Sequence, residues 1–318
     1  MMYNMEKILE NECLRVVIIP GFGGKIISLF HKENLFEAAA QPGDKERMIS
    51  RQGFARYAYG MDDAFPNIDA EELLWNGRKR RYPDHGEIWN ADFTVLSQGQ
   101  DFVRMVWESE TFSYRYEKEV YLLSNMLALR YHITNIGEEE LPAIFTWHGL
   151  MRYEEDMEIL LPKGVGQCRN VLSERILGAP DTVYPYDNPV HNFCRVPPAD
   201  SFRAIKYYLE PGEEEKGKPN SLDDFLTGRE ESLTAISGFY YPSQGMYCML
   251  HYDVKKLPYL GVWITAGGFE GDYNCALEPS NGFYDGIGRA AENRRLPVLA
   301  PGEAMDFELL VSLSGKCL

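Results

Sequence analysis

The chain has 318 residues, of which 45% are hydrophobic and 13% aromatic, a composition typical of a globular protein with a substantial core. With 32 Lys and Arg against 48 Asp and Glu, its formal net charge is −16, so we expect neither nucleic acid nor an anionic membrane surface as a partner. We find no apolar run of membrane-spanning length and no secretory signal. The six cysteines follow neither metal-ligand nor disulfide-framework spacing, so a reducing cytoplasm is the expected location.

The first predicted elements are two strands, residues 14–19 and 25–30, on either side of a glycine-rich turn. The turn, Gly21-Phe22-Gly23-Gly24, lacks the spacing of a nucleotide-binding loop, and no helical pattern follows it. Residues 38–89 then show little periodicity. A connection of this length inside a compact domain is usually functional or disordered, and its aromatic residues argue against disorder.

A chemically crowded stretch, Pro83-Asp84-His85-Gly86-Glu87-Ile88-Trp89, ends this connection. Proline fixes its own backbone φ, and Gly86 has no Cβ, so a ligand or another backbone segment can approach His85 closely. The stretch predicts a rigid loop that presents one imidazole. Taken alone, an Asp-His-Gly tripeptide is more often a polar turn with a solvated histidine.

Alternation of apolar and polar residues predicts the next strands at 102–107, 115–123 and 127–134. His132 falls on the polar face of its strand, and we expect it to be solvated. A turn at 135–137 leads to Thr146-Trp147-His148-Gly149. On an alternating strand Trp147 points away from His148, so we expect Trp147 in the core.

Residues 161–232 are rich in loop-forming residues, and 221–231 fit one short helix with Ser221 as its N-cap. Strands resume at 246–252, 259–265 and 273–277, and a last strand covers 305–313. Many short strands with almost no helical periodicity predict an all-β fold, an antiparallel sandwich or barrel. Because all-β proteins of this size commonly form one domain, we expect a single domain over residues 1–318.

Three stretches carry a resemblance to a known family: Pro83-Asp84-His85-Gly86, Thr146-Trp147-His148-Gly149 and Cys275-Ala276-Leu277-Glu278-Pro279. In their order, spacing and strand-end settings they resemble the aldose 1-epimerase (galactose mutarotase-like) family. The resemblance covers nearly the whole chain, including Gly23-Gly24 and the Pro301-Gly302-Glu303 turn before the last strand. It implies a β-supersandwich, an antiparallel β-sandwich with an open cleft where the three stretches meet.

The activity that the resemblance implies is interconversion of the α and β anomers of a small-molecule sugar. Glu278 would be the base for the anomeric hydroxyl, His148 the acid at the ring oxygen, and His85 a second donor to that oxygen. An ionised carboxylate and a protonated imidazole suffice for this chemistry, so no metal or cofactor is expected.

Other residues are candidates to hold the sugar. The aromatic rings could stack on a sugar face, although core packing explains each at least as well. Asp62 and Asp63 could accept hydrogen bonds from hydroxyls or cap a turn, and Asp84 could help to hold an imidazolium. A further sugar-binding aspartate of the family is not matched by motif, and Asp253 and Asp272 are both candidates. The aromatic candidates are Trp89, Trp263, Phe283 and Tyr284.

The sequence departs from the family pattern at two places. Gly149 and Leu150 follow the second histidine, where the family usually has proline and an aromatic residue, and this puts the wall beside the acid in doubt. Trp89 lies near the position where members that act on hexose 6-phosphates tend to carry arginine, so an unphosphorylated aldose is the expected substrate. The identity of the sugar, whether it is phosphorylated, with Arg51, Arg56 or Arg152 in place of the family's arginine, and the oligomeric state, monomer or homodimer, stay open.

Two functions from other classes also stay open. His85, His148 and Glu278 would form a 2-His-1-carboxylate set for non-haem iron. Alternatively, the sandwich could be a sugar-binding or polysaccharide-processing protein, with Asp84, Glu87 and Glu278 as candidate glycosidase carboxylates.

Overall fold

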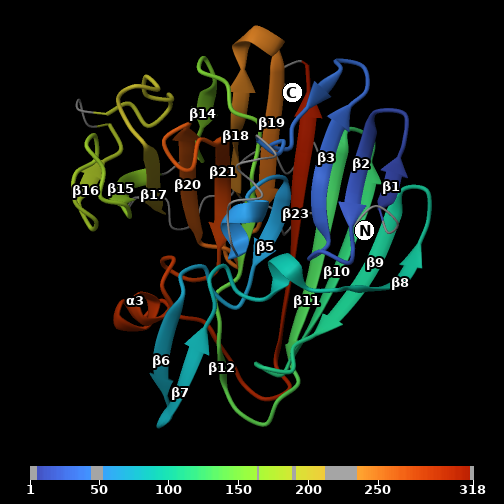
Figure 1. The fold of residues 1–318 in the computed structure, drawn as a ribbon, viewed down its shortest axis with the longest axis vertical. Coiled ribbons are helices and arrows are strands. Elements are labelled where there is room, and N and C mark those ends of the chain that lie inside the picture. Colours follow the sequence, from blue (N-terminus) through green and yellow to red (C-terminus); the bar gives the residue numbers. More distant parts are fainter. Residues whose placement is uncertain (1–5, 44–52, 163–164, 188–190, 212–234, 316–318) are drawn as a thin grey trace.

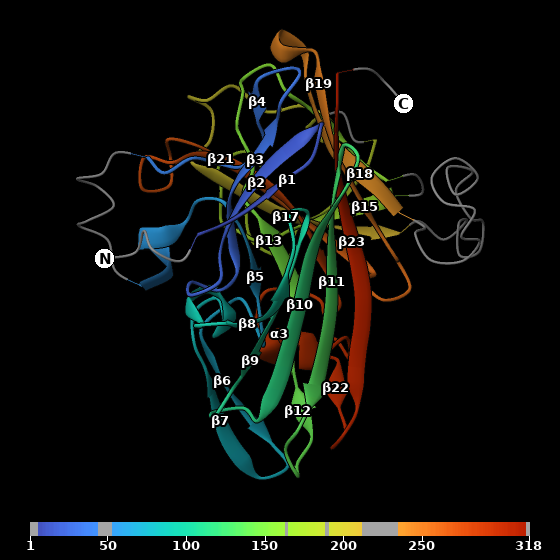
Figure 2. The same cartoon turned by 90° about the vertical axis from the view of Figure 1, so that its right-hand side faces the viewer.

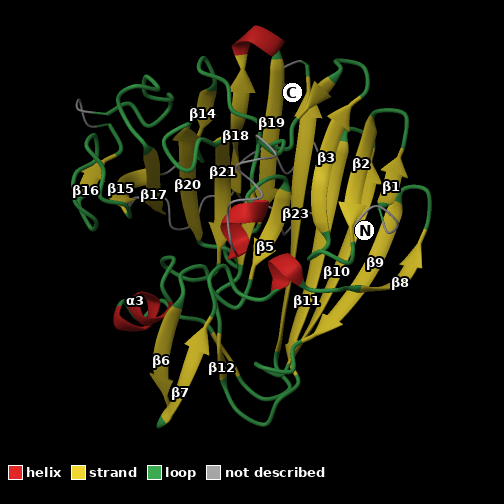
Figure 3. Cartoon of the chain, in the orientation of Figure 1, coloured by secondary structure: helices red, strands yellow, loops and turns green. Residues whose placement is uncertain are grey.

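Antiparallel strands make up most of the chain, and helices are few and short (Figure 3). The computed structural model describes residues 6–43, 53–162, 165–187, 191–211 and 235–315. Their strands form an 11-stranded sheet, an 8-stranded sheet and two small two-stranded sheets (Figure 1). No helix in these ranges is long and apolar enough to cross a membrane.

The 11-stranded sheet runs in the order β1 (Lys7–Glu10), β2 (Leu14–Ile19), β3 (Lys25–His31), β5 (Met61–Ala64), β13 (Thr146–Gly149), β21 (Tyr273–Ser280), β20 (Tyr259–Ala266), β17 (Ala204–Pro211), β15 (Val165–Asn170) and β16 (Val183–Pro185), with β4 (Phe36–Glu37) beside β3. The 8-stranded sheet runs in the order β14 (Glu158–Leu160), β18 (Ala235–Tyr241), β19 (Met246–Tyr252), β23 (Ala304–Ser314), β11 (Met126–Asn135), β10 (Tyr114–Leu123), β9 (Phe102–Glu108) and β8 (Thr94–Gln98). Figure 2 shows β10, β11 and β23 side by side.

The remaining elements are short. A hairpin of β6 (Glu71–Trp75) and β7 (Arg78–Tyr82) lies at the same end of the molecule as β12 (Leu141–Pro142) and β22 (Val298–Leu299) (Figures 1 and 2). The helical elements are α3 (Ile287–Glu292) and the 3-10 turns η1 (Gly53–Tyr57), η2 (Ile88–Asn90) and η4 (Pro242–Gln244).

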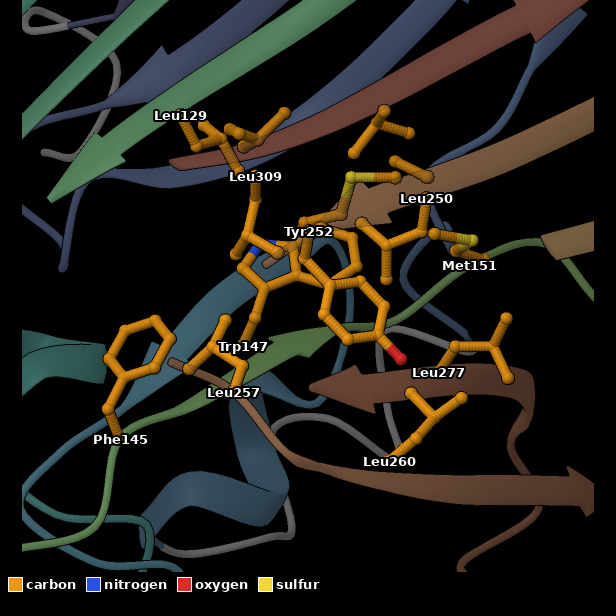
Figure 4. Close-up of a cluster of buried hydrophobic side chains, with 14 of the residues drawn as sticks. Leu129, Phe145, Trp147, Met151, Leu250, Tyr252, Leu257, Leu260, Leu277 and Leu309 are labelled. Atoms are coloured by element: carbon orange, nitrogen blue, oxygen red, sulfur yellow. The ribbon is translucent and has the colours of Figure 1, made fainter. Parts of the chain in front are cut away.

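The core lies between the inner faces of the two large sheets. The side chains of strand β10 alternate between buried and more exposed positions along nearly its whole length, so one face of the strand points into this core. Trp147 and Leu277 of the larger sheet meet Leu129 and Leu309 of the smaller one in the cluster of Figure 4. Each such side chain contributes about 1.5–3 kcal/mol when it is fully buried. Trp147 is fully buried, so its predicted core position is confirmed.

Most strands predicted from alternation are confirmed, and the all-β fold class is confirmed with them. Residues 161–232 are rich in loop-forming residues and no strand was predicted there, but the segment contains β15, β16 and β17. Strands β5, β6 and β7 were also missed in 38–89, where β7 consists almost entirely of charged residues. The predicted helix at 221–231 lies outside the described residues.

Strand order explains how distant motifs meet. Five neighbouring strands, β5, β13, β21, β20 and β17, come from widely separated parts of the sequence. In their register His148 lies opposite Asp62, Glu278 opposite Gly261, and Lys206 opposite Trp263. The side chains of Asp62, Glu278, His148 and Lys206 therefore lie on neighbouring strands in the middle of the larger sheet.

Candidate functional site

A cavity of about 350 Å³ lies beside these central strands. Its lining includes all three residues that the motifs predict to react, His85, His148 and Glu278. Ligand pockets usually measure roughly 300–1,000 Å³, so the volume suits a small ligand such as a monosaccharide. The sequence prediction that the three motifs meet in one cleft is consistent with this geometry.

The loop before η2 presents His85 to the cavity with its backbone fixed on both sides. The His85 amide donates to the Ile68 carbonyl at 2.6 Å, and the Glu87 amide donates to the Phe65 carbonyl at 2.8 Å. Gly86 has a φ of +67°, and a Cβ there would lie 2.1 Å from the Phe65 carbonyl oxygen. The glycine thus permits the approach of another backbone segment, and its replacement would displace the histidine loop.

Two neighbours fix the His85 ring. Phe54 of η1 stacks on it with ring centroids 3.7 Å apart and an interplanar angle of 10°. Nδ1 lies 2.9 Å from Asp84 Oδ1. Burial lowers the pKa of His85, although the hydrogen bond to Asp84 acts in the opposite direction. At neutral pH the ring is therefore mainly uncharged, with Nδ1–H donating to Asp84 and Nε2 able to accept.

Two buried charges support His148 from behind. Asp62 Oδ1 accepts a hydrogen bond from Nδ1 of His148 at 3.0 Å, and Asp62 Oδ2 accepts one from Lys25 Nζ at 2.5 Å. Lys25 also donates to the carbonyls of Tyr57 and Tyr59. Burial opposes ionisation of Asp62, but Lys25 and His148 outweigh it and lower the pKa of Asp62. This carboxylate fixes the proton on Nδ1 and leaves Nε2 for chemistry.

Glu278 lies on the other side of the gap from His148. Its Oε1 is 3.9 Å from His148 Nε2, and Lys206 Nζ is 2.9 Å from its Oε2. Glu278 is fully buried, and among the described residues neither of its oxygens accepts a well-formed hydrogen bond. Direct hydrogen bonds are about 2.7–3.2 Å long, so at 3.9 Å His148 and Glu278 do not exchange a proton directly.

Carboxylates outnumber cations around the cavity. Lys206 is the only lysine or arginine among its described lining residues, against five aspartates and glutamates. At Asp69 desolvation raises the pKa of the carboxyl to about 6, and the neighbouring Asp285 carboxylate acts in the same direction. An added phosphate group would be repelled here. The five carboxylates belong to Asp69, Asp84, Asp272, Glu278 and Asp285.

The glycine after His148 is explained by core packing. A Cβ on Gly149 would lie 2.2 Å from the buried Trp147 ring. Leu150, which stands where the resembling family usually has an aromatic residue, lines the cavity. The departure from the family pattern therefore changes the cavity wall and leaves His148 in position.

Of the residues predicted to hold a sugar, Asp84 and Trp263 line the cavity. Trp263 is oriented by its Nε1–H, which donates to Asn274 Oδ1 at 2.8 Å. Asp272 also lines the cavity, whereas Asp253 lies in a separate surface hollow with Lys256. Asp272 is therefore the better candidate for the further aspartate.

Besides Tyr284, whose hydroxyl donates to Asp181 Oδ1 at 3.2 Å, four other candidates do not line the cavity. Asp62 is buried behind His148, and Asp63 is buried in an ion pair with Lys118 at 2.7 Å. Phe283 is buried beside Tyr208 and Tyr259. These positions leave the three residues no direct contact with a ligand in the cavity, because other protein groups occupy their surroundings.

The fourth, Trp89, packs edge-on against Phe54 and Phe22. Its ring supports Phe54, which in turn stacks on His85. His132, predicted to be solvated, is exposed and hydrogen-bonded to Asp306.

Three residues of the cavity wall were missed in the sequence. Lys206 lies in the segment interpreted as loop, although Ile205, Tyr207 and Leu209 around it alternate as in a strand. That pattern could have revealed β17. Asp285 lies in an irregular segment and Phe54 in the 3-10 turn η1, and neither carries a comparable signal.

The alternatives gain no support from this geometry. Within the described ranges, no group of three or more His, Cys, Asp or Glu side chains is placed to hold a metal ion. Glu87, a candidate glycosidase carboxylate, accepts hydrogen bonds from Ser109 and Tyr114 and does not line the cavity.

Comparison with known proteins gives matches only among solved structures. No protein-family model and no curated protein sequence matches the chain. The Slr1438 protein of Synechocystis sp. PCC 6803 is similar, with a TM-score of 0.72 and 16% identity over 98% of this chain and 96% of the other. A galactose mutarotase-like protein of Lactobacillus casei is also similar, with a TM-score of 0.70 and 17% identity over 97% of this chain and 100% of the other.

An Escherichia coli K12 protein with the provisional name aldose 1-epimerase gives a TM-score of 0.71 and 16% identity over 98% of this chain and 99% of the other. Identities this low establish the fold alone. The fold is the galactose mutarotase-like β-sandwich that the sequence resemblance implied.

Proposed function

We propose that this chain, whose fold is the galactose mutarotase-like β-sandwich, is an aldose 1-epimerase that interconverts the α and β anomers of an unphosphorylated aldose. The observation that carries the proposal is the pairing of His148 with Glu278 across the cavity, each held by a buried group of opposite charge. Asp62 accepts a hydrogen bond from His148 Nδ1, and the Lys206 ammonium lies 2.9 Å from Glu278 Oε2.

The proposed reaction needs only proton transfers. Glu278 removes the proton from the anomeric hydroxyl, while Nε2–H of His148 protonates the ring oxygen and the C1–O5 bond breaks. Rotation about C1–C2 turns the other face of the aldehyde toward the oxygen at C5. On re-closure that hydroxyl returns its proton to His148, and Glu278 returns its proton to O1. Each positioned acid or base typically contributes about 10²–10⁴ in rate.

The sugar has to fit between the acid and the base. His148 Nε2 and Glu278 Oε1 are 3.9 Å apart, and the ring oxygen and the anomeric oxygen of the sugar are bonded to the same carbon, so one can approach His148 while the other approaches Glu278. Catalytic contacts often tighten only when the substrate is bound.

His85 has a narrower part in this scheme than the resemblance implies. Its lowered pKa and the Nδ1 contact with Asp84 favour a neutral ring with an unprotonated Nε2. In that form His85 accepts a hydrogen bond from a sugar hydroxyl, and it donates to the ring oxygen only when it is protonated. We assign the acid role to His148 for this reason.

The substrate we propose is a neutral monosaccharide. The excess of carboxylates around the cavity argues against a phosphorylated sugar. We place the activity in the cytoplasm, since the described cysteines are free thiols, as is usual in a reducing compartment.

The test is polarimetry of freshly dissolved α-anomers of several unphosphorylated aldoses. We expect the protein to accelerate equilibration of at least one of them above the spontaneous rate, with equal activity in the presence of a chelator. Matched 6-phosphates should be poorer substrates. Activity that disappears in the chelator and returns with iron would support the metal alternative, and release of reducing ends from oligosaccharides would support the glycosidase alternative.

The rate should depend on pH as a bell. On the acidic side Glu278 becomes protonated and can no longer act as a base, and on the alkaline side His148 loses the proton that it donates. Because the two groups interact, the apparent pKa values of the two limbs belong to the pair and not to either residue alone. A His148→Asn variant should lose the alkaline limb, and a variant that kept it in full would exclude His148 as the acid.

A further inference from the structure

Lys206 forms a buried bridge between two carboxylates of the cavity wall. Its Nζ lies 2.9 Å from Glu278 Oε2 and 3.0 Å from Asp285 Oδ2. The Tyr208 hydroxyl donates to the other Asp285 oxygen, Oδ1, at 2.7 Å, which fixes Asp285 in turn. All four side chains are buried. The ammonium is therefore held at the base from the side opposite to His148.

We propose that Lys206 is a positioning residue that keeps Glu278 ionised and oriented for proton abstraction, and that Asp285 with Tyr208 sets the strength of this effect by sharing the ammonium. The inference rests on the proposed function and deepens it. It differs from any role for Lys206 in contacting the sugar, because the residue acts through Glu278.

The surroundings explain why a cation is needed here. The His148 ring, on β13, faces Glu278 from one side. Asp285 lies on the far side of Lys206 from Glu278. The other titratable groups on the cavity wall are three more carboxylates and His85, which is mainly neutral. Without Lys206, a fully buried Glu278 would face mostly negative charge, and its protonated form would be favoured. The three carboxylates are those of Asp69, Asp84 and Asp272.

A nucleophilic role does not fit Lys206. A lysine that attacks an aldehyde has to be unprotonated, so such residues have lowered pKa values. Burial acts in that direction at Lys206, but the carboxylates of Asp285 and Glu278 outweigh it and raise the pKa. The amine stays charged and cannot form a Schiff base with the open-chain sugar.

The experiment compares pH–rate profiles of two variants with opposite expected shifts. Lys206→Met removes the cation and keeps the length of the side chain, so the acidic limb should move to higher pH by about 1–3 units. Asp285→Asn removes a negative charge and leaves the ammonium to Glu278, so the limb should move to lower pH. Lys255→Met, the same change at an exposed lysine outside the cavity, should leave the profile unchanged.

Opposite shifts distinguish an electrostatic role from a structural one, because general loss of packing would lower activity without moving the limb in a direction set by charge. An unshifted acidic limb in folded Lys206→Met protein would overturn the inference. If that variant does not fold, the direction of the Asp285→Asn shift decides alone: a downward shift supports the inference, and no shift or an upward shift contradicts it.

A second measurement does not depend on activity. Carbon-13 NMR of glutamate-labelled protein follows ionisation of the Glu278 carboxylate, with its signal assigned by its absence in Glu278→Gln. We expect Glu278 to stay ionised to lower pH in the native protein than in Lys206→Met. If no aldose is turned over but this difference is found, the proposed function fails while the electrostatic role of Lys206 stands; if turnover is found without the difference, the inference alone fails.

Discussion

Glu278→Gln is expected to lower kcat by about 10²–10⁴-fold, roughly 3–5 kcal/mol in barrier, and to leave sugar binding nearly unchanged. The amide keeps the shape of the carboxylate but cannot accept the anomeric proton. Because the lost interaction is made in the transition state, the effect should fall on kcat rather than on KM. Lys206 keeps Asp285 as a partner at 3.0 Å in this variant, so its charge is still compensated.

The measurement is a pair on one preparation: thermal melting with and without saturating sugar, and polarimetric turnover. Retained stabilisation by sugar together with lost turnover would support the base role. The matched control is Glu87→Gln, at a carboxylate that accepts hydrogen bonds from Ser109 and Tyr114 outside the cavity. It should affect stability alone. Near-normal turnover by folded Glu278→Gln protein would exclude most of the proposed mechanism.

The sequence predicted the residues that carry local signals. His85 lies in the Pro83-Asp84-His85-Gly86 motif, and His148 and Glu278 lie in two other short motifs. The family resemblance implied that the three motifs meet in one cleft, and the three residues line one cavity. Trp147 was assigned to the core on alternation alone, and it lies there.

The partners of these residues could not be predicted in the same way, because they depend on the pairing of distant strands. Asp62 supports His148 only because β5 pairs with β13 in one register, and that pairing joins positions 86 residues apart. Lys206 reaches Glu278 because β20 lies between their strands. Period-two patterns show which residues share a face of one strand, but not which strand lies next to it.

The charges of Asp62 and Asp63 misleadingly suggested exposed positions. Asp62 and Asp63 follow each other in a segment rich in turn residues, where exposed carboxylates are the usual expectation. Each instead meets a buried lysine, Lys25 or Lys118, that comes from another strand. Apolar patterning alone would have placed both lysines on the surface, since lysine is almost never fully buried unless it is paired.

The buried Lys25 leads to the second large expected effect. Lys25→Met should lower the free energy of unfolding by about 3–5 kcal/mol, because it leaves Asp62 as a buried charge without its cation and two backbone carbonyls without their donor. Chemical denaturation of both proteins measures the difference. The matched control is Lys32→Met, which removes a 2.8 Å ion pair with Glu10 at the surface and should cost less than about 1 kcal/mol.

Two further measurements separate charge from packing at this position. Adding Asp62→Leu to Lys25→Met removes the isolated charge, so the double variant should be more stable than Lys25→Met alone although it lacks one more native contact. A double variant less stable than the single one would contradict the assignment.

Acid provides the second measurement. In the native protein the lowered pKa of Asp62 gives stability that is present at neutral pH and is lost as pH falls through that lowered value. In Lys25→Met, burial without the cation favours the neutral acid, so moderate acidification protonates Asp62 in the folded protein and removes the unpaired charge. The stability difference between native protein and variant should therefore begin to narrow above the ordinary pKa of an aspartate, as the variant's Asp62 is protonated, and narrow further below it, as the native Asp62 is protonated. A difference that stayed constant would assign the loss to packing around Lys25 rather than to its charge.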